Sequence, residues 1–93
     1  MAMQAKHIVV HGRVQGVGFR YFVHEAAMRL GLKGNVGNLP DSTVEITVEG
    51  DPAQIVEFIR EIELGPSLAR VRRVEVHDIP VTGCYSTFQI EGW

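Results

Sequence analysis

Cysteine is almost absent from this sequence, because Cys84 stands alone among 93 residues. A single cysteine excludes an intrachain disulfide and a zinc site built from several thiolates. A reducing cytoplasm is the compartment that this cysteine usage favours. The first apolar run, residues 8–10, is too short for the core of a signal peptide or for a membrane span. We therefore expect an untargeted, cytoplasmic protein with no membrane partner.

Positive charge is also scarce. Nine Lys and Arg stand against eleven Asp and Glu, which gives a net charge of −2, and no basic run is longer than Arg72–Arg73. Nonspecific binding to nucleic acid depends on accumulated positive charge, so the composition does not favour a nucleic-acid partner. Any anion that the chain binds must be held locally by a few groups.

The length and composition are those of one ordinary globular domain. The chain is 45% hydrophobic and 22% charged, and no repeat or Pro/Ser-rich linker divides it. A domain of this size buries roughly 60–65% of the surface of its unfolded chain. We expect a single domain over residues 1–93 that acts as a monomer.

Hydrophobic spacing predicts an alternation of strands and helices. Period-two alternation predicts strands over 7–12, 34–38, 43–49, 71–76 and 88–90, and three- and four-residue spacing predicts helices over 20–30 and 52–64. Asp51 before Pro52 is a helix-start signal, and Gly65–Pro66 is a helix stop. The alternation slips at Arg72–Arg73, which indicates a β-bulge.

This order is β-α-β-β-α-β with one short extra strand. It predicts an α+β fold, a ferredoxin-like α/β sandwich with two helices on one face of a mainly antiparallel sheet. The third strand places Val44, Ile46 and Val48 inward. Its outward residues are Thr43, Glu45, Thr47 and Glu49. Such a fold hosts many activities, so function must come from a site.

The strongest candidate site is the glycine-rich loop, residues 12–20, which joins the first strand to the first helix. Glycines let the backbone curl so that N–H groups point inward at a helix N-terminus, where an anion is favoured. Arg20 adds a planar guanidinium suited to phosphoryl oxygens. For a generic loop the alternative is a tight turn with a solvated arginine. The loop lacks the lysine of a nucleotide-binding P-loop, and no cofactor is expected.

Two segments carry a specific resemblance. Residues 14–20, Val-Gln-Gly-Val-Gly-Phe-Arg, resemble the signature of the acylphosphatase family, and Gly34, Val36 and Asn38 with Val44 and Gly50 match its second signature. Gly65–Pro66 and the residues after it also resemble bacterial members. The similarity covers essentially the whole chain.

The resemblance implies hydrolysis of acyl phosphates to a carboxylate and inorganic phosphate, without a metal. It implies that Gln15, Gly16, Val17, Gly18, Phe19 and Arg20 bind the substrate phosphate. Asn38 would orient the attacking water, and Thr43 would support Asn38 through its hydroxyl. Inorganic phosphate should then compete with substrate. Carbamoyl phosphate, acetyl phosphate and a glycolytic acyl phosphate are all compatible with this reading.

Three positions depart from the family pattern. Members usually carry an aromatic residue at Asn35, a longer side chain at Gly37 and a glycine at Ser42. These departures concern packing beside the second strand, and they leave Arg20 and Asn38 in place.

Two other functions are alternatives to this one. Without the resemblance, Asn38 before Leu39–Pro40 would be interpreted as a turn residue. A noncatalytic phosphate-binding accessory domain of the same fold is the main alternative. An RNA-binding sheet is disfavoured, because the outward acidic residues of the third strand repel phosphates.

The four histidines do not suggest a metal site. His7 and His11 share a strand face but lie about 13 Å apart along it, too far for one ion. His24 and His77 are expected to be surface or partly buried polar residues.

Overall fold

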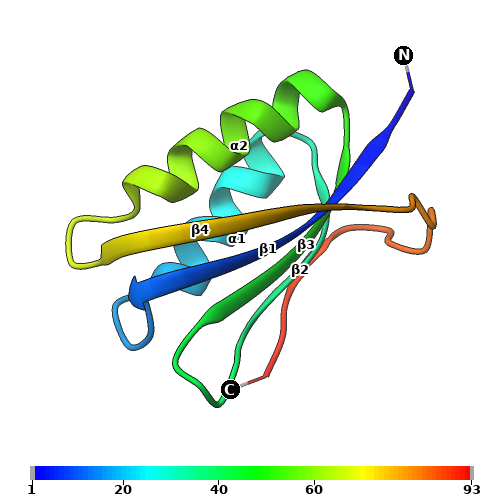
Figure 1. The fold of residues 1–93 in the computed structure, drawn as a ribbon. Helices are drawn as coiled ribbons and strands as arrows, with labels where there is room; N and C mark the ends of the chain where they lie inside the picture. The colour runs from blue at the N-terminus through cyan, green and yellow to red at the C-terminus, as the bar shows by residue number, and fades with distance from the viewer. Residues whose placement is uncertain (1, 93) are drawn as a thin grey trace.

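The computed structural model describes residues 2–92, which form a five-stranded sheet and two helices. In chain order the elements are β1 (Gln4–Arg13), α1 (Phe19–Arg29), β2 (Lys33–Asn38), β3 (Val44–Gly50), α2 (Pro52–Leu64), β4 (Arg70–Ile79) and β5 (Phe88–Ile90). The strand order is β4-β1-β3-β2-β5, and all neighbours are antiparallel except β2 and β5. Both helices cover the same face of the sheet (Figure 1). The predicted ferredoxin-like α+β fold is confirmed.

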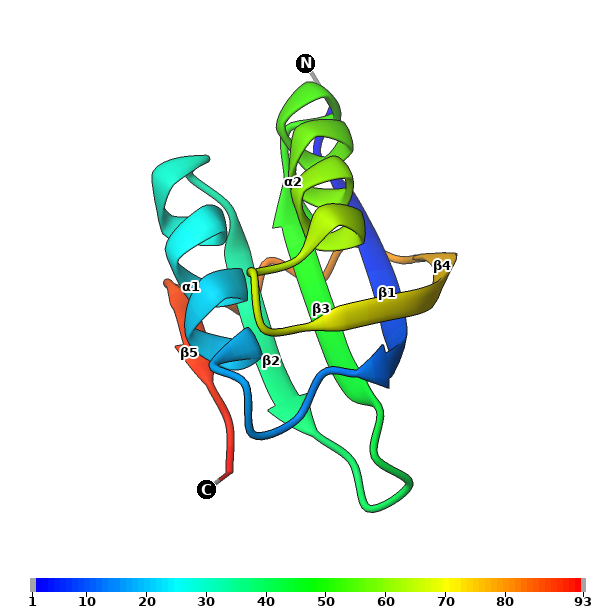
Figure 2. The same ribbon diagram turned by 90° about the vertical axis from the view of Figure 1, so that its left-hand side faces the viewer.

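The core lies between the sheet and the two helices (Figure 2). Alternation points Ile8 and Ile46 from the central strands into this layer, where both are fully buried. Val23 of α1 and Phe58 of α2 are fully buried against them. Burial of each such side chain stabilises the fold by about 1.5–3 kcal/mol relative to exposure.

Helix α2 begins and ends where the sequence predicted. The Asp51 carboxylate accepts a hydrogen bond of 2.9 Å from the Ala53 amide, and Pro52 occupies the first turn. Gly65 follows the last turn with a φ of 68°. Within residues 2–92, neither helix is long and apolar enough to cross a membrane.

A β-bulge joins β1 to β4, as the slip in the sequence pattern predicted. His11 pairs with Arg73, whereas the next residue, Gly12, pairs with Val71, so Arg72 is the extra residue. A Cβ atom on Gly12, which has a φ of 131°, would lie 2.0 Å from the Arg70 carbonyl oxygen. The bulge therefore requires glycine at this point.

The C-terminal ends of β1 and β2 lie at the same end of the sheet. Both strands pair antiparallel with β3 and so run parallel to each other, and Val44 pairs with both Val10 and Asn38. Neighbouring strands lie about 4.8 Å apart, so the backbones of Val10 and Asn38 are roughly 10 Å apart. The glycine-rich loop and the β2–β3 turn therefore both leave the sheet at this end (Figure 1).

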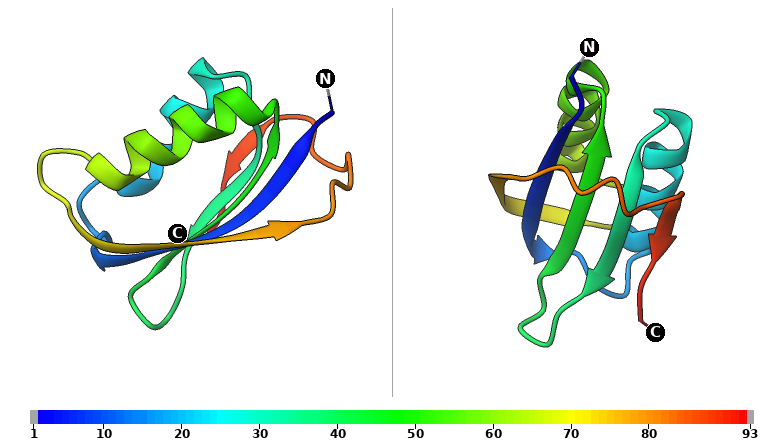
Figure 3. Two further views of the ribbon diagram at one scale, coloured as in Figure 1. Left: turned by 45° about the horizontal axis from the view of Figure 1, so that its top comes forward. Right: turned by 90° about the vertical axis from the view of Figure 1, so that its right-hand side faces the viewer.

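Glu49 departs from the sequence prediction of an outward, solvent-facing residue. Its side chain is 3% exposed, because the segment between β4 and β5 crosses the sheet beside it (Figure 3). The carboxylate accepts hydrogen bonds from the Thr82 amide (2.8 Å), the Thr82 hydroxyl (3.0 Å) and the Gly83 amide (3.2 Å). These donors belong to a segment that is more than thirty residues away in sequence, so strand alternation alone could not predict this burial.

The environment of Glu49 predicts a pH-dependent contribution to stability. The Thr82 amide, then the Thr82 hydroxyl and the Gly83 amide, lower the pKa of Glu49 below its ordinary value of 4.5, although burial opposes them. Because the folded-state pKa is the lower one, this contribution is present above pH 4.5 and is lost as the pH falls through the folded-state pKa. Glu49→Gln should lower the free energy of unfolding by about 1–2 kcal/mol at pH 7. Urea denaturation from pH 7 to pH 3 measures it.

The matched control is Glu63→Gln, a change on the exposed side of α2. It should leave stability within about 0.5 kcal/mol of the unmodified protein. The difference caused by Glu49→Gln should shrink below pH 4.5. A difference that stays constant down to pH 3 would contradict this role for the Glu49 charge.

Candidate active site

The glycine-rich loop depends on left-handed backbone at two glycines. Gly16 has a φ of 72° and Gly18 a φ of 76°. A Cβ atom at either position would meet nothing within 4 Å, so the requirement is conformational rather than steric. Alternation of right- and left-handed residues turns successive N–H groups toward one side, the arrangement that binds anions.

The N-terminus of α1 has no protein cap. Gly18 occupies the N-cap position without a side-chain hydrogen bond, and the first turn carries no acidic residue. The first N–H groups of a helix lack partners within the helix and lie at the positive end of its dipole. In α2, by contrast, Asp51 fills the same role. The start of α1 is therefore open to an external anion.

Arg20 lies in the first turn of α1, beside these N–H groups. Its Nη1 donates a hydrogen bond of 3.0 Å to the main-chain carbonyl of Glu91, in the segment after β5. Because this acceptor is a neutral carbonyl, the bond orients the guanidinium without neutralising its charge. The other N–H donors of the guanidinium can meet a phosphoryl group.

Asn38 presents a buried oxygen without a partner. It lies at the end of β2 on the same strand face as the fully buried Val36. Its Oδ1 is the one buried side-chain polar atom among residues 2–92 that has no hydrogen-bond partner. Leaving such a group unsatisfied costs about 1–3 kcal/mol, and a residue that carries this cost is a candidate functional residue.

Arg20, Asn38 and part of the loop line one small cavity of about 100 Å³. Its lining is Val14, Gly16, Gly18, Phe19, Arg20, Tyr21 and Asn38. The fold thus brings Asn38 together with four residues of the predicted phosphate-binding loop: Gly16, Gly18, Phe19 and Arg20. Three predicted residues lie outside this lining: Gln15 turns toward the β2–β3 turn, Val17 packs partly against the core, and Thr43 bonds Asp41.

Gln15 connects the loop to the turn after β2. Its Nε2 donates hydrogen bonds of 2.9 Å to the carbonyl of Leu39 and 2.9 Å to the carbonyl of Thr43. The Gln15 side chain is thus engaged with protein. Sequence analysis did not find this link, because nothing in the spacing shows which carbonyls a glutamine reaches.

Thr43 is held by Asp41 rather than by Asn38. Its hydroxyl donates to Asp41 Oδ1 at 2.5 Å and its amide donates to the same oxygen at 3.0 Å. These bonds, the hydroxyl first, lower the pKa of Asp41 below its ordinary value. The Thr43 hydroxyl does not bond the oxygen of Asn38, so any support it provides acts through the conformation of the turn.

The C-terminal segment is the other contributor that sequence analysis missed. Glu91 meets Arg20 through its carbonyl, and its amide donates a hydrogen bond of 2.7 Å to the carbonyl of Val36. A Cβ atom on Gly37 would lie 3.2 Å from Cβ of Glu91. The glycine at position 37 therefore suits the close approach of this segment, and main-chain contacts of this kind leave no side-chain signal in a sequence.

The four histidines lie where the sequence placed them, on partly buried or exposed positions. His7 bonds Glu45 at 2.8 Å, and His11 bonds Glu75 at 2.5 Å. Within residues 2–92, no three His, Cys, Asp or Glu side chains gather as metal ligands.

A glycine-rich loop at an uncapped helix N-terminus, on a ferredoxin-like sandwich, is the arrangement of a small α+β protein suited to binding an anion. A family model described as acylphosphatase matches residues 6–90. The chain is 43% identical over 90 residues to an acylphosphatase of Chlorobaculum tepidum, which covers 97% of this chain and 98% of the relative. The chain belongs to the acylphosphatase family.

Solved structures agree with this assignment. The acylphosphatase of Bacillus subtilis superposes with a TM-score of 0.91 and 35% identity, covering 98% of this chain and all of that one. HypF, solved in a phosphate- and nucleotide-bound form, matches 98% of this chain with 12% of its own length, at a TM-score of 0.88 and 40% identity. The protein is thus an enzyme, an acylphosphate phosphohydrolase whose substrates are small-molecule acyl phosphates.

The backbone conformation of Ser42 predicts that replacing this residue, in the turn beside the site, can stabilise the protein. It is the one non-glycine residue among residues 2–92 with a left-handed backbone, at a φ of 77°. Left-handed geometry costs a residue with a Cβ about 1–2 kcal/mol, partly offset by the extra freedom that glycine gives the unfolded chain. Ser42→Gly should therefore raise the free energy of unfolding by about 0.5–1 kcal/mol in urea denaturation.

Ser42→Ala is the matched control, because it removes the hydroxyl and keeps the Cβ. It should bring no gain in stability. If alanine stabilised the protein as much as glycine, the hydroxyl rather than the backbone would be the source of the effect.

Proposed function

We propose that the substrate phosphate binds where the glycine-rich loop meets the start of α1. The single observation that carries this proposal is the shared cavity of Arg20 and Asn38. Inward N–H groups, the positive end of α1 and the Arg20 guanidinium together stabilise charge on the phosphoryl oxygens. Much of the barrier to phosphoryl transfer is electrostatic, so these groups supply most of what the reaction needs.

Asn38 positions the attacking water. Its amide is neutral and is no effective base, but as part of the cavity lining it can hydrogen-bond a water. A water fixed in line with the breaking P–O bond reacts as if it were intramolecular. The reaction is direct hydrolysis, with no phosphorylated enzyme as an intermediate.

The leaving group needs no general acid. An acyl phosphate expels a carboxylate, whose conjugate acid has a pKa of about 4, so it departs as an anion at neutral pH. Arg20 and the loop amides stabilise the charge that develops on the phosphoryl group and on this oxygen. Gln15 and Thr43 act indirectly, by holding the β2–β3 turn that carries Asn38.

A second candidate is a noncatalytic, phosphate-binding accessory domain. The likeness to a small part of HypF favours it, since there the same fold is one portion of a longer chain. The two functions differ in turnover. An accessory domain binds phosphate at the same loop but does not hydrolyse an acyl phosphate.

We place the enzyme in the cytoplasm, a view supported by the unpaired, exposed Cys84, and we expect it to act as a monomer.

Removal of Arg20 or Asn38 should abolish most of the activity. Arg20→Ala and Asn38→Ala are each expected to lower kcat for benzoyl phosphate by about 10²–10³-fold, the usual cost of losing one transition-state donor or a positioned water. Hydrolysis is followed by absorbance in the presence of EDTA. Circular dichroism verifies that each variant is folded.

Two controls remove the same functional groups elsewhere. Arg60→Ala lies on the exposed side of α2, and Asn35→Ala lies on β2 with its side chain on the opposite strand face from Asn38. Both should keep kcat within about threefold. Loss of turnover in EDTA would point to a metal, and a folded but inactive unmodified protein would favour the accessory domain.

Inorganic phosphate should inhibit competitively. Substrate and product phosphate use the same loop, so phosphate should raise KM and leave kcat unchanged. The measurement is a series of initial rates with benzoyl phosphate at increasing phosphate, at constant ionic strength. Sulfate, a dianion of similar shape, is the control for anion size. Purely noncompetitive inhibition would place phosphate outside the substrate site.

A further inference from the structure

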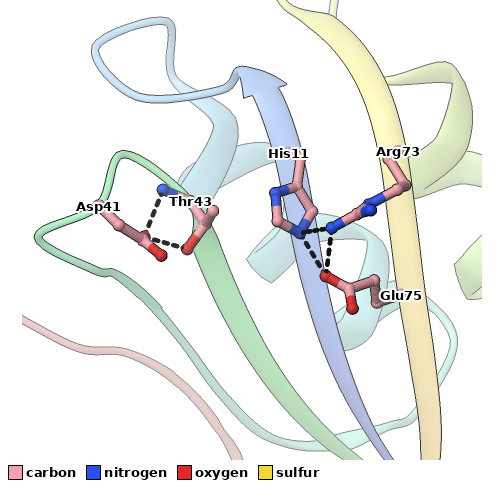
Figure 4. Close-up of polar contacts among 5 residues, drawn as sticks. All are labelled: His11, Asp41, Thr43, Arg73 and Glu75. Atoms are coloured by element: carbon pink, nitrogen blue, oxygen red, sulfur yellow. Dashed lines mark hydrogen bonds and ion pairs between the residues drawn. The ribbon is translucent and has the colours of Figure 1, made fainter.

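A second, larger hollow lies on the side of the sheet away from the helices (Figure 4). Its volume is about 520 Å³, and we call it the hairpin hollow. Its lining is His11, Gly12, Asp41, Ser42, Thr43, Arg72 and Arg73. None of these residues lines the cavity of Arg20 and Asn38, and the volume is within the range of small-molecule sites.

The β-bulge places two neighbouring arginines on one wall. Val71 and Val74 both pack against the core, so the two residues between them both turn away from it. In a regular strand, Arg72 and Arg73 would lie on opposite faces. The extra residue at the bulge is therefore what brings both guanidinium groups to the hollow.

Arg73 is anchored, whereas Arg72 is available. Arg73 Nη2 donates a hydrogen bond of 3.0 Å to Glu75 Oε2, and His11 Nε2 lies 2.5 Å from the same oxygen. A contact this short requires a proton on His11 Nε2, so this nitrogen cannot also accept from Arg73 at 3.2 Å. The remaining N–H groups of Arg73 are free for a ligand. Among residues 2–92, no carboxylate forms an ion pair with Arg72.

The opposite wall presents hydrogen-bond acceptors and hydroxyls. Asp41 uses one carboxylate oxygen, Oδ1, to hold the amide and hydroxyl of Thr43. Its other oxygen stays available as an acceptor, and Ser42 adds a hydroxyl from a strained, left-handed position. The hollow is therefore polarised, with cations on the β1–β4 wall and acceptors on the turn.

We propose that the hairpin hollow binds a small organic phosphate that carries hydroxyl groups. The phosphate would meet Arg72 and the free face of Arg73, and the hydroxyls would donate to Asp41. A phosphate monoester carries about −1.5 to −2 charges at pH 7, more than the carboxylate of Glu75 with which it shares Arg73. Inorganic phosphate alone would leave the acceptor wall unmatched. This binding does not depend on hydrolysis at Arg20 and Asn38.

Glucose 6-phosphate is a suitable probe, followed by amide chemical shifts of the full chain in NMR titration. Shifts are expected at Gly12, Ser42 and Arg72, with a single dissociation constant. Inorganic phosphate should instead shift Gly16 and Gly18 of the catalytic loop, and glucose should shift neither set. Shifts of the loop alone with glucose 6-phosphate would overturn the proposal, as would no binding.

Matched variants separate the two walls. Arg72→Ala should weaken glucose 6-phosphate binding by about tenfold, the loss of one or two charge-assisted hydrogen bonds. Arg70→Ala, which removes the same charge from the same strand outside the hollow, should change it less than twofold. Asp41→Asn should weaken glucose 6-phosphate more than it weakens any response to inorganic phosphate at the hollow.

Citrate tests the anion class, because it offers carboxylates without a phosphate. Citrate binding tighter than that of glucose 6-phosphate would overturn the assignment of a phosphate ligand. Equal weakening by Arg72→Ala and Arg70→Ala would show general electrostatic attraction instead of a site. Arg72→Ala should leave kcat for benzoyl phosphate unchanged. A loss of binding at the hairpin hollow is therefore distinguishable from a failure of the catalytic proposal.

Discussion

The pairing of β1 and β2 with the same central strand is the constraint on which the active site depends. Because both pair antiparallel with β3, they run parallel to each other, and both finish at the same end of the sheet. Val44 sets the register, since it faces Val10 on one side and Asn38 on the other. A shift of one residue in the β2–β3 ladder would turn Asn38 to the other face of the sheet. The buried alternation of β3 therefore supports both the core and the catalytic geometry.

Three unfavourable features meet in the cavity that this register creates. The first turn of α1 lacks a cap, a buried oxygen of Asn38 lacks a partner, and a guanidinium is held by a neutral carbonyl instead of a carboxylate. The first two features leave polar groups without protein partners, and the third leaves a positive charge that the proposed phosphate would pair with. Missing caps and unpaired polar groups of this kind are typical of functional sites. The well-capped helix α2 shows that the same chain satisfies these groups where no ligand is needed.

The β2–β3 turn serves both hollows. Gln15 holds its main chain from the side of the catalytic loop, while Asp41 and Ser42 face the hairpin hollow on the other side. Asp41 bonds Thr43, and the carbonyl of Thr43 is in turn an acceptor for Gln15. A ligand that contacts Asp41 would thus touch a residue that is connected to the glycine-rich loop through Thr43 by two hydrogen bonds. The stability of this turn links the two sites physically.

The sequence by itself determined the elements and the reactive groups. Alternation on β3, the Asp51–Pro52 start of α2 and the slip at Arg72–Arg73 are local patterns, and local patterns need no knowledge of distant partners. Only the tertiary structure decided where these groups lie relative to others. Glu49 was expected outward and is buried by Thr82 and Gly83, Thr43 bonds Asp41 rather than Asn38, and Glu91 orients Arg20 through its main chain. These contacts depend on how the folded chain brings groups together, and the spacing of residues along the sequence does not show that. The sequence therefore reveals the groups but not their partners.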